Sequence, residues 1–218
     1  MRVHYHDVTS KKDFILGEHS AVIKSVVSHN PKGLIITGSW DKTIKGWTIN
    51  APNAAFSTNA SDKVYAMATA DHFIAVGTAD KNVSVFDVRK VAQPFAIRNS
   101  GFTQHIRSIT WLNTGEGYAV ASSEGRVAVE FVTSSKKAFS FKCHRVIQEP
   151  TQPGSSSTTL VYPINALAVH SKHGSLATGG SDSSVCIWDI ESKKRVSRVQ
   201  LPCSYQIFSL FHHIESKP

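Results

Sequence analysis

Apolar residues along the chain form short runs, and each run is bounded by Gly, Asn, Asp or Ser. Several runs, such as Leu34-Ile35-Ile36 and Ala119-Val120-Ala121, place apolar side chains on both faces of a strand, which is typical of sheets covered on both sides. No segment has the apolar spacing of an amphipathic helix. The pattern therefore predicts an all-β protein made of short strands.

The runs recur as a repeat whose turns contain an acidic residue: Asp41, Asp80, Glu124 and Asp182. The spacings of 39, 44 and 58 residues start close to the period of about 40–45 residues that four-stranded propeller blades show. The pairs Phe86–Asp87 and Trp188–Asp189 have the form of the WD dipeptide that ends the third strand of such blades. These observations predict a WD-repeat β-propeller.

Each repeat is predicted to contain four strands. The predicted strands are 21–28, 34–38, 43–49 and 54–58 in the first repeat, 64–70, 73–78, 82–88 and 95–98 in the second, 107–112, 117–122, 126–132 and 138–142 in the third, and 164–170, 175–180, 184–190 and 195–201 in the fourth. Two further strands, 2–7 and 13–17, precede them, and 206–213 follows them.

The repeats divide the propeller region, residues 1–218, into full and partial blades. Full blades are expected at 19–60, 61–104, 105–145 and 163–203, with the end of a preceding blade at 1–18 and the start of a further blade at 204–218. Residues 146–162, rich in Pro, Gln, Ser and Thr, are expected to form a flexible surface loop. Because an open stack exposes apolar blade faces, we expect a fragment of a longer propeller, an incomplete gene model or a chain that closes with another chain.

One set of polar residues in the first repeat has the order of a structural hydrogen-bond network. His19, Ser39, Asp41 and Trp47 supply a ring, a hydroxyl, a turn carboxylate and an indole N–H. A buried and fully satisfied network of this kind fixes a loop against its sheet. We therefore interpret His19 as structural rather than catalytic.

The composition is that of a globular protein, and the sequence contains no P-loop, GxSxG or HExxH motif that would indicate a catalytic centre. The chain is 41% hydrophobic and 18% charged, with a formal charge of +8 that favours anionic partners. Its three cysteines lie far apart and include no CxxC pair, which argues against disulfides and zinc. No catalytic residue, metal site or cofactor is predicted, and neither a membrane nor direct nucleic-acid partner is expected.

Four segments resemble one family within the WD-repeat proteins. GSWDKTIKGW (38–47), SSEGRVAVEF (122–131), AFSFKCHR (138–145) and VYPINALAVHSKHGSLATGGSDSSVCIWD (161–189) are similar to the mitotic-checkpoint propeller of the Bub family. They also resemble its paralogue, the messenger-RNA export propeller of the Rae/Gle family. Both families are seven-bladed, so the resemblance implies that this chain covers about four full blades and parts of others.

The resemblance implies a non-enzymatic adaptor of the spindle assembly checkpoint. Its partners would be checkpoint kinases with a GLEBS-type motif, a phosphorylated kinetochore scaffold peptide and regulators of the anaphase-promoting complex. Its location would be the nucleus, and the kinetochore in mitosis. The family's basic positions match Arg126, Lys142 and Arg145, which would bind paired glutamates of the motif, with Arg126 and Arg145 nearest to the phosphate site.

Alternatives stay open at this point. From spacing alone Arg126 is an ordinary turn arginine with a solvated head, and Trp40 is either a peptide anchor or an aromatic packed on its own turn. The export paralogue differs in partner and location. A non-functional truncated product is the third interpretation.

Overall fold

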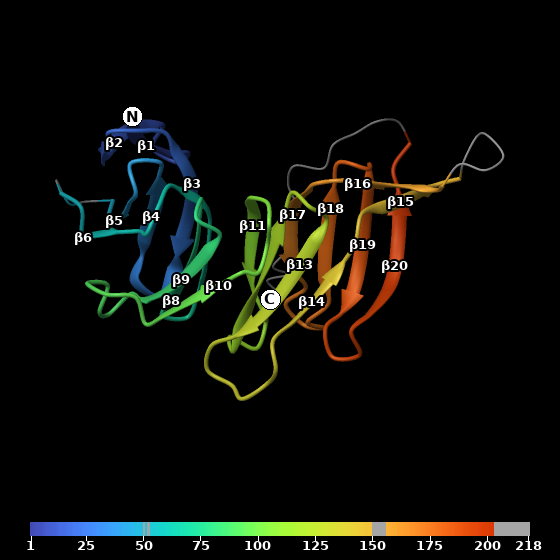
Figure 1. Ribbon diagram of the computed structural model, residues 1–218. Helices are drawn as coiled ribbons and strands as arrows, with labels where there is room; N and C mark the ends of the chain where they lie inside the picture. The colour runs from blue at the N-terminus through green and yellow to red at the C-terminus, as the bar shows by residue number, and fades with distance from the viewer. Residues whose placement is uncertain (50, 52, 150–155, 203–218) are drawn as a thin grey trace. The chain divides into compact units, whose positions relative to one another are not determined.

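The computed structural model describes residues 1–49, 51, 53–149 and 156–202, and in these ranges the regular structure is almost entirely β-strand (Figure 1). The exception is a short 3₁₀ turn, η1 (Asn30–Lys32). Among these residues no helix is long and apolar enough to cross a membrane. The all-β prediction is confirmed. The chain forms two compact units, residues 1–101 and 102–218.

The first unit contains one two-stranded and two four-stranded antiparallel sheets. The hairpin pairs β1 (Arg2–Asp7) with β2 (Lys12–Glu18). The first four-stranded sheet contains β3 (Ile23–His29), β4 (Leu34–Ser39), β5 (Thr43–Trp47) and β6 (Phe56–Asn59) in that order. The second contains β7 (Val64–Ala70), β8 (Phe73–Thr78), β9 (Asn82–Asp87) and β10 (Ala96–Asn99).

The second unit repeats this organisation. One four-stranded sheet contains β11 (Ile106–Trp111), β12 (Gly117–Ser122), β13 (Arg126–Phe131) and β14 (Phe139–Lys142). The other contains β17 (Ile164–Val169), β18 (Leu176–Gly180), β19 (Ser184–Asp189) and β20 (Lys194–Gln200). Between them in sequence lies a hairpin of β15 (Arg145–Gln148) and β16 (Thr158–Val161).

All four large sheets share one irregularity, which shows that they are copies of the same unit. The register between the first and second strands shifts at Ile23/Ser25, Val64/Ala66, Ile106/Ser108 and Ile164/Ala166. Each shift lies one residue into the first strand. Such bulges bend a strand and increase its twist, so every sheet begins with the same local geometry.

Neighbouring sheets within each unit bury an apolar core between them. In the first unit Ile36, Val64, Ile74 and Val76 are at most 1% exposed. A Cβ placed on Gly38 would lie 2.6 Å from Val64 Cγ1, so a glycine permits this close approach of the sheets. The core of the second unit contains these buried residues: Leu112, Ala119, Ala121, Val127, Val129, Cys143, Ile164, Leu167, Val169 and Leu176. Both-face burial explains the apolar runs in the sequence.

Most predicted strands agree with the structure within one or two residues at each end, and the largest correction concerns residues 146–162. We expected a flexible loop there, but Val146–Gln148 lie in β15 and Thr158–Val161 lie in β16, and the two strands pair in register. The adjacent Val146 and Ile147 of β15 and the Thr, Leu and Val residues of β16 supply the β-propensity that the Pro- and Ser-rich composition obscures. The strand expected at 206–213 lies outside the described residues.

Candidate functional site

A buried polar network joins the start of the first repeat to its turn and third strand. His19 Nδ1 lies 3.0 Å from Asp41 Oδ2, and its Nε2 lies 2.8 Å from Thr37 Oγ1. The indole Nε1 of Trp47 donates to the same hydroxyl at 2.8 Å. Asp41 also accepts the Thr43 amide at 2.9 Å. The network fixes the turn against β4 and β5.

The pKa directions define how the protons are distributed in this network. Burial lowers the pKa of His19 although Asp41 opposes the change, so the ring is neutral. Burial raises the pKa of Asp41, but hydrogen bonds from Thr43, His19 and Ser20 outweigh it, and the pKa lies far below its usual value. The arrangement that satisfies every group has Nδ1–H of His19 donating to Asp41 while the Thr37 hydroxyl donates to Nε2.

The network corrects one residue of the predicted set. His19, Asp41 and Trp47 are brought together, but the hydroxyl that joins ring and indole belongs to Thr37, not to Ser39. Ser39 Oγ accepts the Asp41 amide at 3.1 Å instead. Both side chains lie on the same face of β4, and Thr37 pairs with Lys45, two residues from Trp47. Ser39 lies one further alternate position away, about 7 Å along the strand, beyond reach of the indole.

An equivalent network in the fourth repeat contains a histidine whose role the sequence did not indicate. His144 Nδ1 and Nε2 lie 2.8 Å from Asp182 Oδ1 and Thr178 Oγ1, and Trp188 Nε1 donates to Thr178 at 3.0 Å. A Cβ on Gly180 would lie 2.4 Å from His144 Nδ1, so glycine leaves room for the ring. His144 precedes its aspartate by 38 residues, against 22 in the first repeat, because the β15–β16 hairpin intervenes. The sequence feature that could have revealed this second network is Thr178 followed ten residues later by Trp188, as Thr37 is followed by Trp47.

The second and third repeats lack this His–Asp–Thr–Trp set. Val76 and Val120, both fully buried, take the strand position of Thr37 and Thr178. The second repeat has Phe86, which carries no donor, where the first and fourth repeats have tryptophan. The third repeat has Glu130 there, and the fully buried ring of Tyr118 lies opposite it across β12 and β13. A threonine and a tryptophan therefore occur together or not at all.

Glu124, the acidic residue of the third repeat, makes different hydrogen bonds from its counterparts in the other repeats. Asp41, Asp80 and Asp182 each accept a backbone amide two residues on, which stabilises a turn whose left-handed residue is Lys42, Lys81 or Ser183. In the third repeat this left-handed residue is Gly125, with φ of 63°, which needs no such support. Glu124 Oε2 instead accepts both the amide and the hydroxyl of Thr103.

Three of the four predicted peptide-binding residues gather around this turn. Arg126 begins β13 and is paired with Lys142, the last residue of β14. Residues directly opposite on antiparallel strands share a face of the sheet. Arg145 Nη2 donates to the backbone oxygen of Glu124 at 3.1 Å, and Arg126 Nη1 lies 3.9 Å from Glu124 Oε1.

The turn is held close to the chain segment that contains Arg145. Cys143 donates its amide to Gly125 O at 2.9 Å. A Cβ on Gly125 would lie 2.7 Å from Cys143 O and 2.9 Å from Val161 Cγ1. Glycine is therefore needed here for its left-handed backbone and for the lack of a side chain. The close contact brings Arg126 and Arg145 to the same edge of the sheet.

The two arginines keep hydrogen-bonding capacity. The Nε atoms of Arg126 and Arg145 are buried and have no hydrogen-bond partner among the described residues, and the same holds for Glu124 Oε1. Arg126 Nη2 donates to Ser140 Oγ at 3.2 Å, and the side chain is 34% exposed. A buried donor without a partner costs stability. The arrangement suits a carboxylate or phosphate, which a guanidinium binds with two parallel hydrogen bonds.

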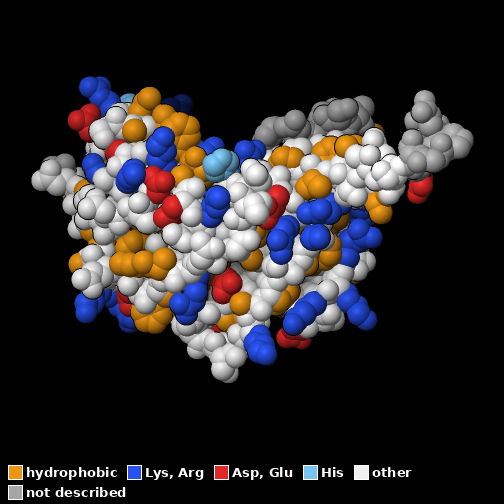
Figure 2. All heavy atoms as spheres, in the orientation of Figure 1, with side chains coloured by type: hydrophobic (Ala, Val, Ile, Leu, Met, Phe, Trp, Pro, Cys, Tyr) orange, Lys and Arg blue, Asp and Glu red, His pale blue; other side chains and the backbone are white. Residues whose placement is uncertain are grey.

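Trp40, the fourth predicted residue, lies in the first unit. It is 38% exposed, its ring meets that of Tyr65 edge-on at 6.3 Å, and Lys63 Nζ lies 5.8 Å from its centre. On the face drawn in Figure 2, Lys and Arg side chains are scattered over both units rather than gathered in one patch. Trp40 therefore combines partial packing on Tyr65 with an accessible edge.

The structure offers no metal-binding group of three or more His, Cys, Asp or Glu side chains within the described ranges. Burial raises the pKa values of Cys143 and Cys186 above their usual range, so both thiols are protonated at neutral pH. The ring of His144, which follows Cys143, already forms hydrogen bonds with Asp182 and Thr178. Cys143 and His144 are therefore structural groups.

Comparison with known proteins identifies the class of the protein. The family model "WD domain, G-beta repeat" matches residues 10–48 and 154–189, the two regions that include Asp41 and Asp182. The four-stranded sheets, their shared bulge and the His–Asp–Thr–Trp networks agree with it. The chain therefore contains WD repeats.

Within that class the resemblance to the Bub family is confirmed. "Mitotic checkpoint protein bub-3" of Caenorhabditis elegans is 36% identical over 197 residues, covering 87% of this chain and 56% of the relative. "Spindle assembly checkpoint protein bub3" of Schizosaccharomyces pombe is 31% identical over 213 residues, covering 96% and 64%. "mRNA export factor GLE2" of Chaetomium thermophilum is 30% identical over 194 residues, covering 87% and 53%. The chain thus spans a little over half the length of the relatives it matches.

A solved structure supports the fold. A chain of the crystal structure of a mitotic checkpoint complex matches 95% of this chain and 60% of its own length, with a TM-score of 0.79 and 17% sequence identity. This agreement concerns the arrangement of the strands. It is consistent with the WD-repeat propeller fold predicted from the sequence.

Proposed function

We propose that this chain is a non-enzymatic, peptide-binding adaptor of the spindle assembly checkpoint. Its similarity to the checkpoint proteins supports the process, and the basic cluster of Arg126, Lys142 and Arg145 supports the mode of binding. The cluster would bind the paired glutamates of a GLEBS-type motif in checkpoint kinases. A phosphorylated kinetochore scaffold peptide is the second proposed partner, with Arg126 and Arg145 nearest to the phosphate, and regulators of the anaphase-promoting complex are the third.

The observation that carries the proposal is the grouping of two guanidinium groups at the Gly125 turn, where the Arg126 side chain is 34% exposed. Arg126 and Arg145 both contact Glu124, yet each has a buried Nε–H without a partner. Because these Nε atoms are buried, a peptide carboxylate would bind the exposed part of the Arg126 guanidinium and would be shielded from water by the peptide itself. Charge-assisted hydrogen bonds of this kind are shorter and stronger than neutral ones. Trp40 is proposed as an additional apolar anchor.

Calorimetry with a synthetic GLEBS-type peptide that contains two adjacent glutamates tests the proposal. Arg126→Glu removes the donors and adds a repulsive charge, so affinity should fall by about tenfold to a hundredfold, since a charge-assisted bond contributes about 1.5–3 kcal/mol. The matched control is Arg195→Glu, an exposed arginine on β20 outside the cluster. Equal small losses in both variants, or no binding by the unaltered chain, would refute the assignment.

The export function is the second candidate because an export factor also matches most of the chain. The two functions differ in location. For a checkpoint adaptor the protein should form foci at unattached kinetochores in mitosis and otherwise reside in the nucleus. A persistent signal at the nuclear rim without such foci would favour the export function.

A further inference from the structure

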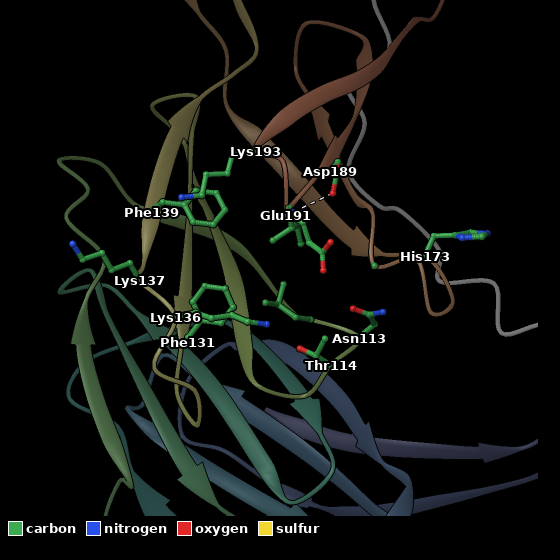
Figure 3. Close-up of a pocket in the computed structure, with 13 residues that line it drawn as sticks. Asn113, Thr114, Phe131, Lys136, Lys137, Phe139, His173, Asp189, Glu191 and Lys193 are labelled. Carbon is green, nitrogen blue, oxygen red and sulfur yellow. Dashed lines mark hydrogen bonds between the residues drawn. The ribbon is translucent and has the colours of Figure 1, made fainter.

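The second unit contains a cavity that the proposed peptide site does not use. It has a volume of about 580 Å³ and is lined by the β11–β12 turn, the β13–β14 loop, the β17–β18 turn and the β19–β20 turn (Figure 3). Arg126 starts β13 and Phe131 ends it, so the cavity and the basic cluster lie at opposite ends of this strand, about 17 Å apart. The two places can therefore be occupied at the same time.

The floor of the cavity is apolar and its rim is charged. Leu112, Phe131, Phe139 and Ile190 supply the apolar surface. Phe131 and Phe139 are half-buried, and each has a lysine beside its ring, as Figure 3 shows. Lys136 Nζ lies 5.6 Å from the centre of Phe131, and Lys193 Nζ lies 4.7 Å from that of Phe139. Such pairs hold a cation at an aromatic face.

The charges at the rim are not equally available to a ligand. Lys136 is paired with Glu116 at 2.8 Å. Asp189 accepts the Glu191 amide at 3.1 Å and the Ser192 hydroxyl at 2.6 Å, so its carboxylate stabilises its own turn. Lys193 has no carboxylate within ion-pair distance among the described residues.

The remaining rim charges set an orientation for the ligand. Lys137 likewise has no ion-pair partner among the residues that the structure describes, and it lies on the same side as Phe139 (Figure 3). Glu191 lines the opposite side. An acidic group would be attracted toward Lys193 and Lys137 and repelled by Glu191. A ligand with one apolar and one acidic group therefore has one favoured orientation.

We propose that this cavity binds a short peptide segment in which an aromatic or large aliphatic side chain is followed by an acidic residue. The apolar side chain would pack between Phe131 and Phe139, and the carboxylate would contact Lys193. The volume falls in the range of about 300–1,000 Å³ that is typical of ligand pockets. The formal charge of +8 on the whole chain also favours acidic partners.

The test uses the full chain, labelled with ¹⁵N, and the probe acetyl-Ala-Phe-Glu-Ala-amide. NMR titration should give saturable shifts confined to residues 112–114, 131–139 and 189–193. A probe with Gln in place of Glu should bind at least about threefold more weakly, because the charge contact with Lys193 is lost. A probe with Lys there should bind at least about tenfold more weakly, because the contact becomes repulsive. Lys193→Glu should weaken the acidic probe about tenfold, whereas Lys194→Glu, a change of the same charge at the next residue outside the cavity, should have less than a twofold effect. Thr114→Trp, which fills the mouth of the cavity, should abolish binding without changing the spectrum elsewhere.

Several outcomes would overturn the proposal. They are the absence of saturable shifts, equal binding of the Lys probe, or shifts centred on Arg126, which would place the probe in the other site. A dimer in sedimentation that Thr114→Trp dissociates would show that a second copy occupies the cavity. Shifts at the cavity with a ten-residue oligothymidine, but not with the peptide, would identify a nucleic-acid ligand instead. Arg126 does not line the cavity, so Arg126→Glu should weaken the GLEBS-type peptide without changing binding of the short probe. Failure of one proposal can therefore be distinguished from failure of the other.

Discussion

Replacing Thr37 with valine tests whether its hydroxyl is the centre of the network in the first repeat. The side chain is fully buried, and it contacts His19 Nε2 and Trp47 Nε1 at 2.8 Å each. Valine has nearly the same shape and occupies the corresponding position in the second and third repeats, as Val76 and Val120. The change therefore removes hydrogen bonds without leaving a large cavity.

The expected cost follows from the two groups that lose their partner. A buried donor or acceptor without a hydrogen bond costs about 1–3 kcal/mol. The indole N–H of Trp47 and Nε2 of His19 would both be left in that state, so the free energy of unfolding should fall by about 2–5 kcal/mol. Ser39→Ala removes only the contact with the Asp41 amide and should cost about 1 kcal/mol.

Urea denaturation followed by circular dichroism and tryptophan fluorescence measures both variants. A double-mutant cycle with Trp47→Phe isolates the pair, because the phenylalanine has no donor to leave unsatisfied. We expect the double variant to be less destabilised than the sum of the single ones, with a coupling energy of about 0.5–3 kcal/mol. Equal losses for Thr37→Val and Ser39→Ala, or strict additivity in the cycle, would contradict the network as described.

Two further predictions concern pH and the Gly125 turn. Because burial lowers the pKa of His19 below its ordinary value of 6.5, the unfolded chain binds a proton that the folded chain does not, so stability should fall as pH decreases through 6.5. Stability should begin to fall again below pH 3.8, the ordinary value from which the pKa values of Asp41, Asp80 and Asp182 are lowered. Urea midpoints measured from pH 8 to 3 follow the first step and the start of the second. His19→Gln should remove the first step, and a midpoint that rises from pH 7 to 5 would contradict it. Gly125→Ala should lower the free energy of unfolding by about 2–4 kcal/mol and weaken binding of the GLEBS-type peptide. Gly115→Ala, also at positive φ but with no atom within 4 Å of the new Cβ, should lower it by only about 1 kcal/mol. Thermal melts compare the two variants, and equal losses would show that the contact with Cys143 is unimportant.

The strands were predictable because their signals are local. Val64–Ala70, Phe73–Thr78 and Gly117–Ser122 begin and end where the sequence predicted. Each is bounded by residues that favour turns, and Phe73–Thr78 and Gly117–Ser122 bury both faces, so apolar composition and β-propensity agree. The repeat spacing then gave the fold class, since four similar units of this length leave few other architectures.

The hairpin and the second network were missed because their signals are not local. Thr158–Val161 follows a segment of Pro, Gly and Ser, and only its pairing with β15 makes it a strand. His144 is separated from Asp182 by that hairpin, so its distance in sequence does not match the first repeat. Thr37 and Ser39 are both hydroxyl residues on one face of β4. Only the structure shows that the Trp47 indole N–H contacts Thr37 and not Ser39.

The predicted basic positions came from the family resemblance, and the structure supplies a physical reason for their arrangement. Arg126, Lys142 and Arg145 lie together because β13 pairs with β14 and because Gly125 allows the turn to contact Cys143. Spacing alone did not distinguish Arg126 from an ordinary turn arginine. The cavity beside Phe131 had no counterpart in the sequence patterns, because its lining comes from turns of two repeats.

The position of His144 links the stability of the fourth repeat to the proposed peptide site. His144 lies directly before Arg145, and its ring is fixed by Asp182 and Thr178 in a fully buried setting. Fixing the ring also fixes the backbone of the next residue, so the Arg145 side chain starts from a defined point. Its contact with the Glu124 carbonyl can then form without first ordering the chain, which would lower the entropic cost of the proposed anion binding. The third repeat lacks such a network, and in its place Glu124 contacts Thr103 and Arg126. Its departure from the repeat pattern thus exchanges a stabilising turn interaction for an arrangement that places two guanidinium groups, one of them 34% exposed, beside the turn.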